Sequence, residues 1–388
     1  MELYMKQLKY SAVAIALIST LAACGGSGSD DTTTPPTDNQ FEFAATEMIT
    51  NLTDDVIVSG YSALAIKGDE LLQATQTLVN NKTQENLLAV QDAWKAARQP
   101  WEQGESHIFG PVDSLSIDPH LDSWPLNTVD LISVLANNTG GFDADTIKGW
   151  NDDIQGFHTM EYLLFGDGVA DNEKIVADLT TTETEYLMGL AEVFLSYTKT
   201  LDDAWQISHD GQTGSYAYGE FVKNPGTEWN NIYASQVGVI EELVNGMIAI
   251  VDEVGNGKIA DPFGTSIATA DTSLVESQYS WNSLTDFSDN IIGVRNVYQG
   301  ELTGASDKQG IVDFVMAADV TLAARVGSEI DDAIIKIQAI KGSNNMPFRQ
   351  AIADADGRVK IQTAIDALSK LQASLTDEVL PLLKNWKV

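Results

Sequence analysis

The stretch GFHTMEYLLFGDG, residues 156–168, determines how the rest of the sequence is interpreted. Positions i and i+3 of an α-helix project from the same side, so His158 and Glu161 are expected to lie next to each other. Large apolar side chains cover most of the remaining circumference, which is typical of a buried helix. A buried carboxylate without a partner is strongly unfavourable. The stretch therefore predicts that hydrogen-bond donors, a counter-charge or a metal ion faces His158 and Glu161.

The sequence beyond residue 40 is predicted to be helical almost throughout. Apolar residues recur at spacings of three and four, short polar breaks separate the segments, and no convincing alternation of strands and turns appears. Besides the opening stretch, we expect helices at residues 41–66, 69–79, 84–99, 128–135, 186–205, 227–254, 273–300, 306–340 and 358–383. The expected fold class is all-α, with two tandem up-and-down helical bundles at residues 41–215 and 216–388. An internal duplication would explain two such bundles, although no sequence repeat is strong enough to prove one.

The N-terminus has the features of a bacterial lipoprotein signal peptide, residues 1–23. Lys6 and Lys9 provide a positive region, the apolar run at residues 10–21 is too short to span a bilayer, and small residues precede Cys24. The alternative is an ordinary secretory signal with an incidental cysteine. Because Cys24 is the only cysteine, the chain has no internal disulfide and no thiolate metal site.

The segment that follows Cys24 bears on where the protein resides. Residues 24–40 are rich in Gly, Ser, Asp, Thr and Pro and are predicted to form a flexible tether. Gly25, rather than an aspartate, follows Cys24. In this respect the segment resembles lipoproteins of the bacterial outer membrane. That resemblance implies a lipid anchor in the outer membrane and a location at the periplasmic face of the cell envelope.

The net charge of −34 excludes whole classes of partner. A surface this acidic argues against binding nucleic acid and against direct adsorption to anionic lipid. It is compatible with attracting cations, although a solvated, salt-tolerant surface is the simpler interpretation.

A second segment dense in polar chemistry is WEQGESHIFGPV, residues 101–112. Together with Arg98 one turn earlier, Glu102 and Glu105 are expected on one helical face, provided that the helix continues through Pro100. If the proline ends the helix, the two glutamates still share a face but Arg98 points elsewhere.

Residues 112–127 contain two prolines and are predicted to form an ordered loop. Asp113, Asp118, His120 and Asp122 could ligate a metal ion, but their spacing matches no known cation-binding loop. Turn and helix-capping roles are the preferred interpretation of these four side chains.

With these segments in view, the chain resembles the imelysin family, also classed as M75 peptidases, which includes iron-regulated bacterial envelope proteins. Gly156, His158 and Glu161 match the GxHxxE motif of the family. Further similarity lies in Trp94 with Arg98, Pro100-Trp101-Glu102 with Glu105, Phe109-Gly110-Pro111, Asp122-Ser123-Trp124-Pro125, Glu276-Ser277-Gln278-Tyr279-Ser280 and Asn290-Ile291-Ile292-Gly293. The resemblance implies two helical-bundle domains with a functional site in a cleft near the motif.

The residues themselves do not fit the familiar peptidase mechanisms. An HExxH zinc peptidase requires a glutamate directly after the first histidine and a second histidine one turn later, but Thr159 and Tyr162 stand there. A thiol protease is excluded because Cys24 is predicted to be lipidated, and no GxSxG segment offers a nucleophile elbow. Peptidase activity would need an unfamiliar arrangement, so whether the protein is an enzyme stays open.

Metal binding fits the residues better. One imidazole with several carboxylates suits iron, manganese or zinc, and helical bundles build such sites from Glu and His on facing helices. We expect the metal ligands to be His158, Glu161, Glu102 and Glu105, with the second nitrogen of His158 held by a hydrogen-bond acceptor. The side chains expected to surround them or contact a ligand are Arg98, Trp101, Trp124 and Tyr162. Alternatively, Arg98 neutralises the carboxylates and the cluster is a purely structural network.

The leading functional hypothesis is an envelope lipoprotein that binds iron, or an iron-containing ligand, for iron uptake or sensing. Its expected cofactor is a metal ion, iron or zinc, and its expected partners are the membrane, through the anchor at Cys24, and another envelope protein. The alternatives are a metallopeptidase and a haem-binding protein with His158 as axial ligand, although the sequence has no CxxCH attachment motif.

Overall fold

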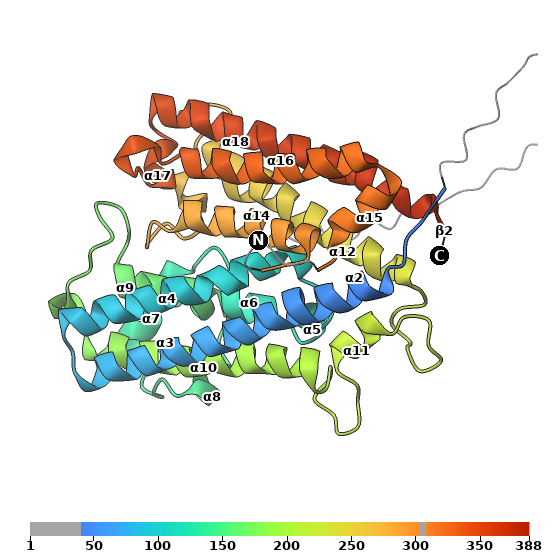
Figure 1. Cartoon of the computed structure of the whole chain (residues 1–388). Coiled ribbons are helices and arrows are strands. Elements are labelled where there is room, and N and C mark those ends of the chain that lie inside the picture. The colour runs from blue at the N-terminus through green and yellow to red at the C-terminus, as the bar shows by residue number, and fades with distance from the viewer. Residues whose placement is uncertain (1–39, 303–307, 388) are drawn as a thin grey trace, which may run out of the picture. The chain divides into compact units, whose positions relative to one another are not determined.

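Two groups of helices lie side by side in the computed structural model of the chain, which describes residues 40–302 and 308–387 (Figure 1). The predicted signal peptide, Cys24 and all of the predicted tether except residue 40 lie outside the described residues. All of the described residues belong to one compact unit. The predicted boundary between residues 215 and 216 and the internal duplication therefore stay predictions, whereas the all-α fold class is confirmed.

The first group contains the helices up to residue 223 and includes the predicted site helix. Its α-helices are α2 (Thr46–Asn51), α3 (Ser59–Asn80), α4 (Gln84–Gly104), α5 (Pro111–Ser114), α6 (Ile117–Asp122), α7 (Thr128–Asn137), α8 (Ala144–Ile147), α9 (Gly156–Phe165), α10 (Thr181–Gln206) and α11 (Tyr218–Lys223). A π-helical segment, η1 (Leu52–Val58), joins α2 to α3. Single 3-10 turns are η2 (Glu105–His107), η3 (Asp152–Ile154) and η4 (Val176–Asp178).

The second group lies above the first in Figure 1. Its α-helices are α12 (Gln236–Asp252), α13 (Asp261–Phe263), α14 (Ser283–Gln299), α15 (Ile311–Ala318), α16 (Val320–Ala339), α17 (Phe348–Ala351) and α18 (Ala355–Ser374). Its π-helical segments are η5 (Glu253–Ala260) and η8 (Leu375–Val379), and its 3-10 turns are η6 (Thr272–Leu274), η7 (Gly342–Asn344) and η9 (Leu380–Lys384).

The two ends of the described chain meet in a minimal parallel pairing. Strand β1 (Phe41–Glu42) pairs with β2 (Trp386–Lys387), with Phe41 opposite Trp386. This contact ties the first described residues to the last ones. No helix in the described ranges is long and apolar enough to cross a membrane.

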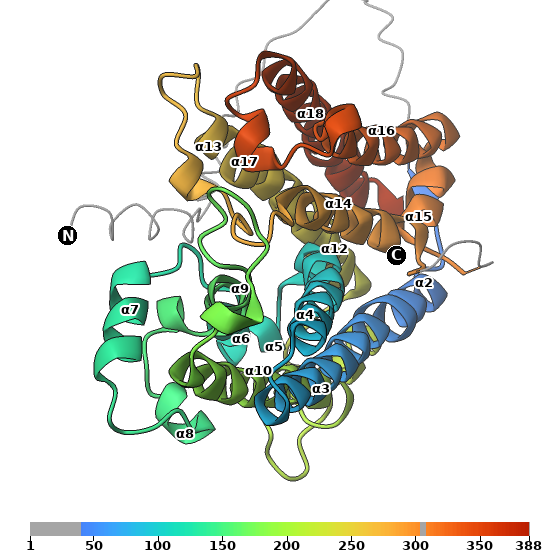
Figure 2. The same ribbon diagram turned by 90° about the vertical axis from the view of Figure 1, so that its left-hand side faces the viewer.

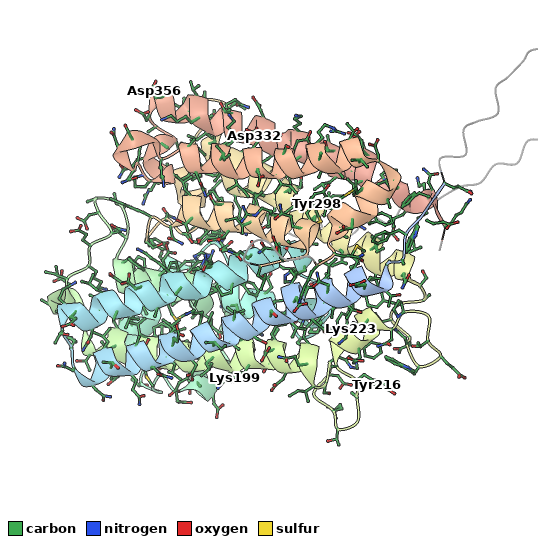
Figure 3. The ribbon with its side chains drawn as sticks, viewed as in Figure 1. Lys199, Tyr216, Lys223, Tyr298, Asp332 and Asp356 are labelled. Atoms are coloured by element: carbon green, nitrogen blue, oxygen red, sulfur yellow. The ribbon has the colours of Figure 1, made fainter. Side chains whose placement is uncertain are left out.

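Helix α4 makes the most extensive contact between the two groups, and turn η2 adds contacts to α12 and α14. Helix α4 packs against α3 and α9 on one side and against α14 on the other, as the end-on view in Figure 2 shows. Helices α4 and α14 approach each other closely at Gly293, where a Cβ would lie only 2.2 Å from the backbone oxygen of Gln103. On the far side, the Tyr298 hydroxyl of α14, labelled in Figure 3, donates to the Ala323 carbonyl of α16 at 2.8 Å. Side chains of α4 can therefore reach the polar face of α14.

Helix α4 continues through Pro100, contrary to the expected end at residue 99. A proline removes one backbone hydrogen bond, but the buried apolar stripe on either side of it holds the helix together. Leu87, Val90, Trp94, Ala97 and Trp101 form this stripe. Because the helix survives, Arg98 and Glu102 do share one face, as the sequence predicted for an uninterrupted helix.

Other element boundaries were predicted wrongly. Residues 112–127 are not all loop, since α5 and α6 occupy much of this segment. The helix expected from residue 273 begins only at Ser283, because Ser277 and Trp281 adopt positive φ angles of 51° and 61° that no α-helix contains. The helix expected from residue 227 begins at Gln236, and it does not end at Gly255 but continues as the π-helical η5.

Candidate metal centre

His158 is brought into the interior by an unusual start of helix α9. Gly156 has φ +65°, and a Cβ there would lie 2.2 Å from the carbonyl oxygen of Leu121 in α6. Only glycine combines this backbone conformation with so close an approach. Consequently the first turn of α9 rests directly against the end of α6, and His158 lies beside Asp122.

Helix α9 is also fixed to helix α4 by side chains that reach its backbone. The indole Nε1 of Trp94 donates to the Phe157 carbonyl at 3.0 Å, and Nε2 of Gln91 donates to the Leu164 carbonyl at 2.8 Å. The second bond satisfies a carbonyl of the last turn, which has no partner within the helix. Both bonds set the distance between His158 on α9 and Arg98 on α4.

Glu161 lies beside His158, as its spacing predicted, and all of its described contacts are with hydrogen-bond donors. Its Oε2 lies 3.1 Å from Nδ1 of His158, while its Oε1 accepts bonds from the backbone NH and the hydroxyl of Ser280 at 2.8 and 2.7 Å. A carboxylate on one nitrogen of a histidine fixes its tautomer and orientation for a ligand on the other nitrogen. Glu161 therefore positions His158.

The other nitrogen of His158 faces a small group of oxygen atoms. Its Nε2 lies 3.1 Å from Oδ1 of Asp122 and 4.0 Å from Oε1 of Glu276. One ligand atom from each of the three residues lies within 4.8 Å of the other two. Nε2 is fully buried and has no hydrogen-bond partner, although Asp122 is within ion-pair distance.

Arg98 is the fully buried cation of the cluster. Its guanidinium forms ion pairs with Glu102, one turn later on α4, and with Asp122 of α6. It also lies 3.1 Å from Glu276 and 3.3 Å from Asp286 of α14. Arg98 thus joins carboxylates from both helix groups, and it contacts the same oxygen atoms of Asp122 and Glu276 that face His158.

Helix α4 and turn η2 supply two further carboxylates on a neighbouring side of the cluster. Oε2 of Glu105 lies 2.8 Å from the ammonium of Lys258, and Oε2 of Glu102 lies 3.5 Å from it. Nδ2 of Asn290 on α14 donates to both carboxylates. The predicted pair Glu102 and Glu105 therefore belongs to the same buried network as His158, but the contacts described for it are with Arg98, Lys258 and Asn290.

The pKa values of the cluster follow from burial and from these charges. Burial lowers the pKa of His158, but the nearby carboxylates of Asp122 and Glu161 outweigh it and raise the pKa to about 9. Burial raises the pKa of Asp122, but Arg98 and His158 bring it well below its usual value. Burial raises the pKa of Glu105 far above its usual value, although Lys258 acts in the opposite direction. Without another cation, His158 carries a proton at neutral pH.

The remaining predicted residues take different positions around this cluster. Trp101 donates from Nε1 to Oδ2 of Asp122 at 2.6 Å, so it holds the carboxylate in place. The ring of Trp124 packs edge-on against His158, with centroids 4.7 Å apart. Tyr162 packs instead on Tyr279 at 5.2 Å, and no contact described for it reaches His158.

Sequence reasoning undervalued several residues that the structure places in the cluster. Asp122 was considered as a ligand but interpreted as a turn residue, and Glu276 was hidden in a segment predicted to be helix. The signal that could have found part of the set is the polar stripe of α14. Asn282, directly before α14, and Asp286 and Asn290 within it recur every four residues and are all buried.

The donor atoms fit a metal ion by three criteria. A buried imidazole nitrogen without a hydrogen-bond partner points at carboxylate oxygens, and nitrogen with oxygen donors suits zinc and iron. The Nδ1 atom of His158 has the carboxylate partner typical of metal-binding histidines. The buried network also has more acidic than basic side chains: Glu102, Glu105, Asp122, Glu161, Glu276 and Asp286 stand against Arg98, Lys258 and His158. This excess of negative charge favours an additional cation.

A helical protein with a buried cluster of one histidine and several carboxylates between two groups of helices is the class that this geometry defines. The chain belongs to the imelysin family, whose model matches residues 57–375. It is 28% identical over 342 residues to iron-regulated protein A of Synechococcus elongatus, covering 87% of this chain and 88% of that protein.

Solved structures show the same fold. A protein of Parabacteroides distasonis, provisionally described as an iron-regulated protein A precursor, is 28% identical with a TM-score of 0.76, covering 93% of this chain and 98% of that one. An imelysin-like protein of Psychrobacter arcticum is only 14% identical but has a TM-score of 0.64, covering 89% of this chain and 98% of that one. The predicted resemblance to the imelysin family is thereby confirmed.

Proposed function

We propose that this protein is a cell-envelope lipoprotein that binds a metal ion, foremost iron, for iron uptake or sensing. The single observation that supports the proposal most is the convergence of Asp122, His158 and Glu276, whose ligand atoms lie within 4.8 Å of one another in the interior. The resemblance to a protein named as iron-regulated favours iron among the metals that this donor set accepts.

The ligand set proposed from the structure differs from the one expected from sequence. His158 would bind through Nε2, with Asp122 and Glu276 as oxygen ligands, while Glu161 would hold the imidazole in position from the Nδ1 side. Arg98 would hold the two carboxylates in place through its ion pairs before the ion arrives. A bound ion would supply positive charge to the acidic cluster, and its arrival would release the proton from His158.

The contacts favour a bare ion over haem or peptidase chemistry. Both nitrogen atoms of His158 lie 3.1 Å from carboxylate oxygens, which leaves no room for a porphyrin on either side without displacing Asp122 or Glu161. The residues that a zinc peptidase of the HExxH type requires are absent from this chain, since Thr159 and Tyr162 stand in their places.

The location is proposed on the sequence pattern. The apolar leader, the small residues before Cys24 and the polar segment after it support lipidation at Cys24 and a tether to the outer membrane. An envelope protein that passes iron onward or receives it is the proposed partner.

The test is a comparison of metal binding by wild type and His158→Ala, with His120→Ala as the matched control. His120 is a half-exposed histidine that pairs with Asp152 at 2.6 Å outside the cluster. Calorimetry and metal analysis with Fe²⁺, Fe³⁺, Zn²⁺ and Mn²⁺ should show an ion bound to wild type and His120→Ala but lost in His158→Ala. Equal binding by all three proteins, or binding by none, would reject the proposal.

A further inference from the structure

The ammonium group of Lys258 occupies the centre of a group of carboxylate oxygens. Its Nζ lies 2.8 Å from Oε2 of Glu105, 3.3 Å from Oε1 of Glu276 and 3.5 Å from Oε2 of Glu102. The three acids come from turn η2, from the loop before α14 and from α4. Lys258 itself is only 6% exposed. A buried lysine is rare unless it is paired, and this one is paired three times.

The backbone that carries Lys258 is unusual as well. After α12 the chain continues as η5, in which the helical turn is widened to the π form. Such turns are rare and are often found at functional sites. Val254, Gly255, Lys258 and Ile259 are buried, whereas Asn256 and Gly257 face solvent. The widened turn therefore directs a lysine, among apolar neighbours, into the acidic cluster.

One oxygen atom links Lys258 to the proposed metal position. Oε1 of Glu276 contacts the ammonium at 3.3 Å and lies 4.0 Å from Nε2 of His158. The carboxylate of Glu276 thus faces both the ammonium and the proposed metal position. A carboxylate lies between two ions in the same way in two-metal sites, where the ions are about 3.5–4 Å apart. Here the ammonium stands at one of the two positions, and the guanidinium of Arg98 contacts the same oxygen at 3.1 Å.

The group around Lys258 is already arranged for a cation. Nδ2 of Asn290 donates to Glu102 and Glu105 and holds their oxygens toward one another. Two carboxylates held so close repel each other unless positive charge lies between them. The ammonium of Lys258 supplies this charge, because it lies no more than 3.5 Å from an oxygen of each of the three acids.

We infer that the ammonium of Lys258 fills a second cation position, formed by Glu102, Glu105 and Glu276, and so limits the site to one metal ion. The inference rests on the proposed function, because the second position shares Glu276 with the first. It makes Lys258 the residue that determines how many ions bind. Replacing it with a neutral side chain turns a one-metal site into a two-metal site bridged by Glu276.

The experiment compares wild type with Lys258→Gln and Lys258→Met, with Lys258→Arg as the matched control that keeps the charge. Mn²⁺ is the probe, because calorimetry and metal analysis give its stoichiometry and electron paramagnetic resonance separates isolated ions from exchange-coupled pairs. Wild type and Lys258→Arg are expected to bind one ion with the spectrum of an isolated centre. The two neutral variants are expected to bind two ions with a coupled spectrum.

The possible results distinguish failure of the proposed function from failure of this inference alone. If wild type binds no ion, the proposed function fails together with this inference. If wild type binds one ion and the neutral variants also bind one, with an unchanged dissociation constant, only the inference is overturned. The variants are prepared with and without Mn²⁺. Folding that requires two bound ions supports the inference, whereas failure to fold even with Mn²⁺ contradicts it, because the second ion should replace the lost ammonium.

Discussion

Glu161 holds His158 by a contact of 3.1 Å between Oε2 and Nδ1, and Ser280 holds Glu161 in turn through its backbone NH and its hydroxyl. The chain of contacts begins in the loop before α14 and ends at Nε2 of His158, so the orientation of the imidazole depends on both helix groups. The GxHxxE motif thus contains one candidate ligand and the residue that positions it.

This division of roles predicts different effects for the two residues of the motif. Glu161→Gln should weaken metal binding by about 10- to 100-fold, because the imidazole loses its carboxylate partner but keeps its ligand atom. His158→Ala should abolish binding. Calorimetry measures both effects, with Glu185→Gln, an exposed position of α10, as the control. Complete loss of binding in Glu161→Gln would instead indicate that Glu161 is itself a ligand.

Arg98 is predicted to stabilise the metal-free protein more than any other basic side chain of the cluster. Arg98→Met leaves Glu102, Asp122 and Asp286 without their shared partner, and breaking a buried pair in this way costs about 3–5 kcal/mol. Urea unfolding of the metal-free proteins measures the loss.

The control for this prediction is Arg295→Met. Arg295 is one-third exposed and lies 3.9 Å from Asp331, so its removal should cost less than about 1 kcal/mol. A similar small cost for Arg98→Met would show that its carboxylates become protonated without penalty. Added Zn²⁺ should restore more stability to Arg98→Met than to wild type, because the ion supplies part of the missing charge.

The sequence predicted the fold class, the family and the burial of His158 with Glu161, because these depend on local patterns. A histidine three residues before a glutamate on an apolar helix must lie beside it, whatever else the chain does. The face shared by Arg98 and Glu102 was also predicted, conditionally on the helix passing Pro100. Its survival depends on tertiary packing of α4, which no local pattern reports.

The partners across the site could not be predicted in the same way. Glu276 lies in an irregular segment with positive φ angles at Ser277 and Trp281, and its sequence mimics the start of a helix. Lys258 was overlooked because two glycines before it suggested a helix end, whereas packing extends the helix as a π turn. Glu276 lies near His158, and Lys258 lies near Glu102, only because distant parts of the chain pack together. Helical periodicity carries no information on such contacts.

Gly156 and Gly166 offer a matched test of how α9 positions His158. Both have positive φ, +65° and +86°, so alanine strains the backbone by about 1–3 kcal/mol at either position. A Cβ at Gly166 meets nothing within 4 Å, whereas at Gly156 it would lie 2.2 Å from the Leu121 carbonyl oxygen. Gly156→Ala should therefore be clearly the more destabilising in thermal unfolding and should also weaken metal binding. Equal effects would mean that α9 shifts away from α6 at no cost.

The raised pKa of His158 predicts how the stability of the metal-free protein depends on pH. Its pKa is about 9 in the folded state against 6.5 for the unperturbed group, because burial is outweighed by Asp122 and Glu161. The folded state therefore binds the proton more tightly, and the resulting stabilisation is complete below about pH 6.5 and is lost as the pH rises through 9. A shift of this size corresponds to roughly 3 kcal/mol at most. Urea unfolding of wild type and His158→Gln at about pH 6 and about pH 9.5, with a chelator present, isolates this contribution. The difference in unfolding free energy between the two proteins should be larger at the lower pH, and a difference that is constant or grows with pH would show that His158 is neutral in the folded protein.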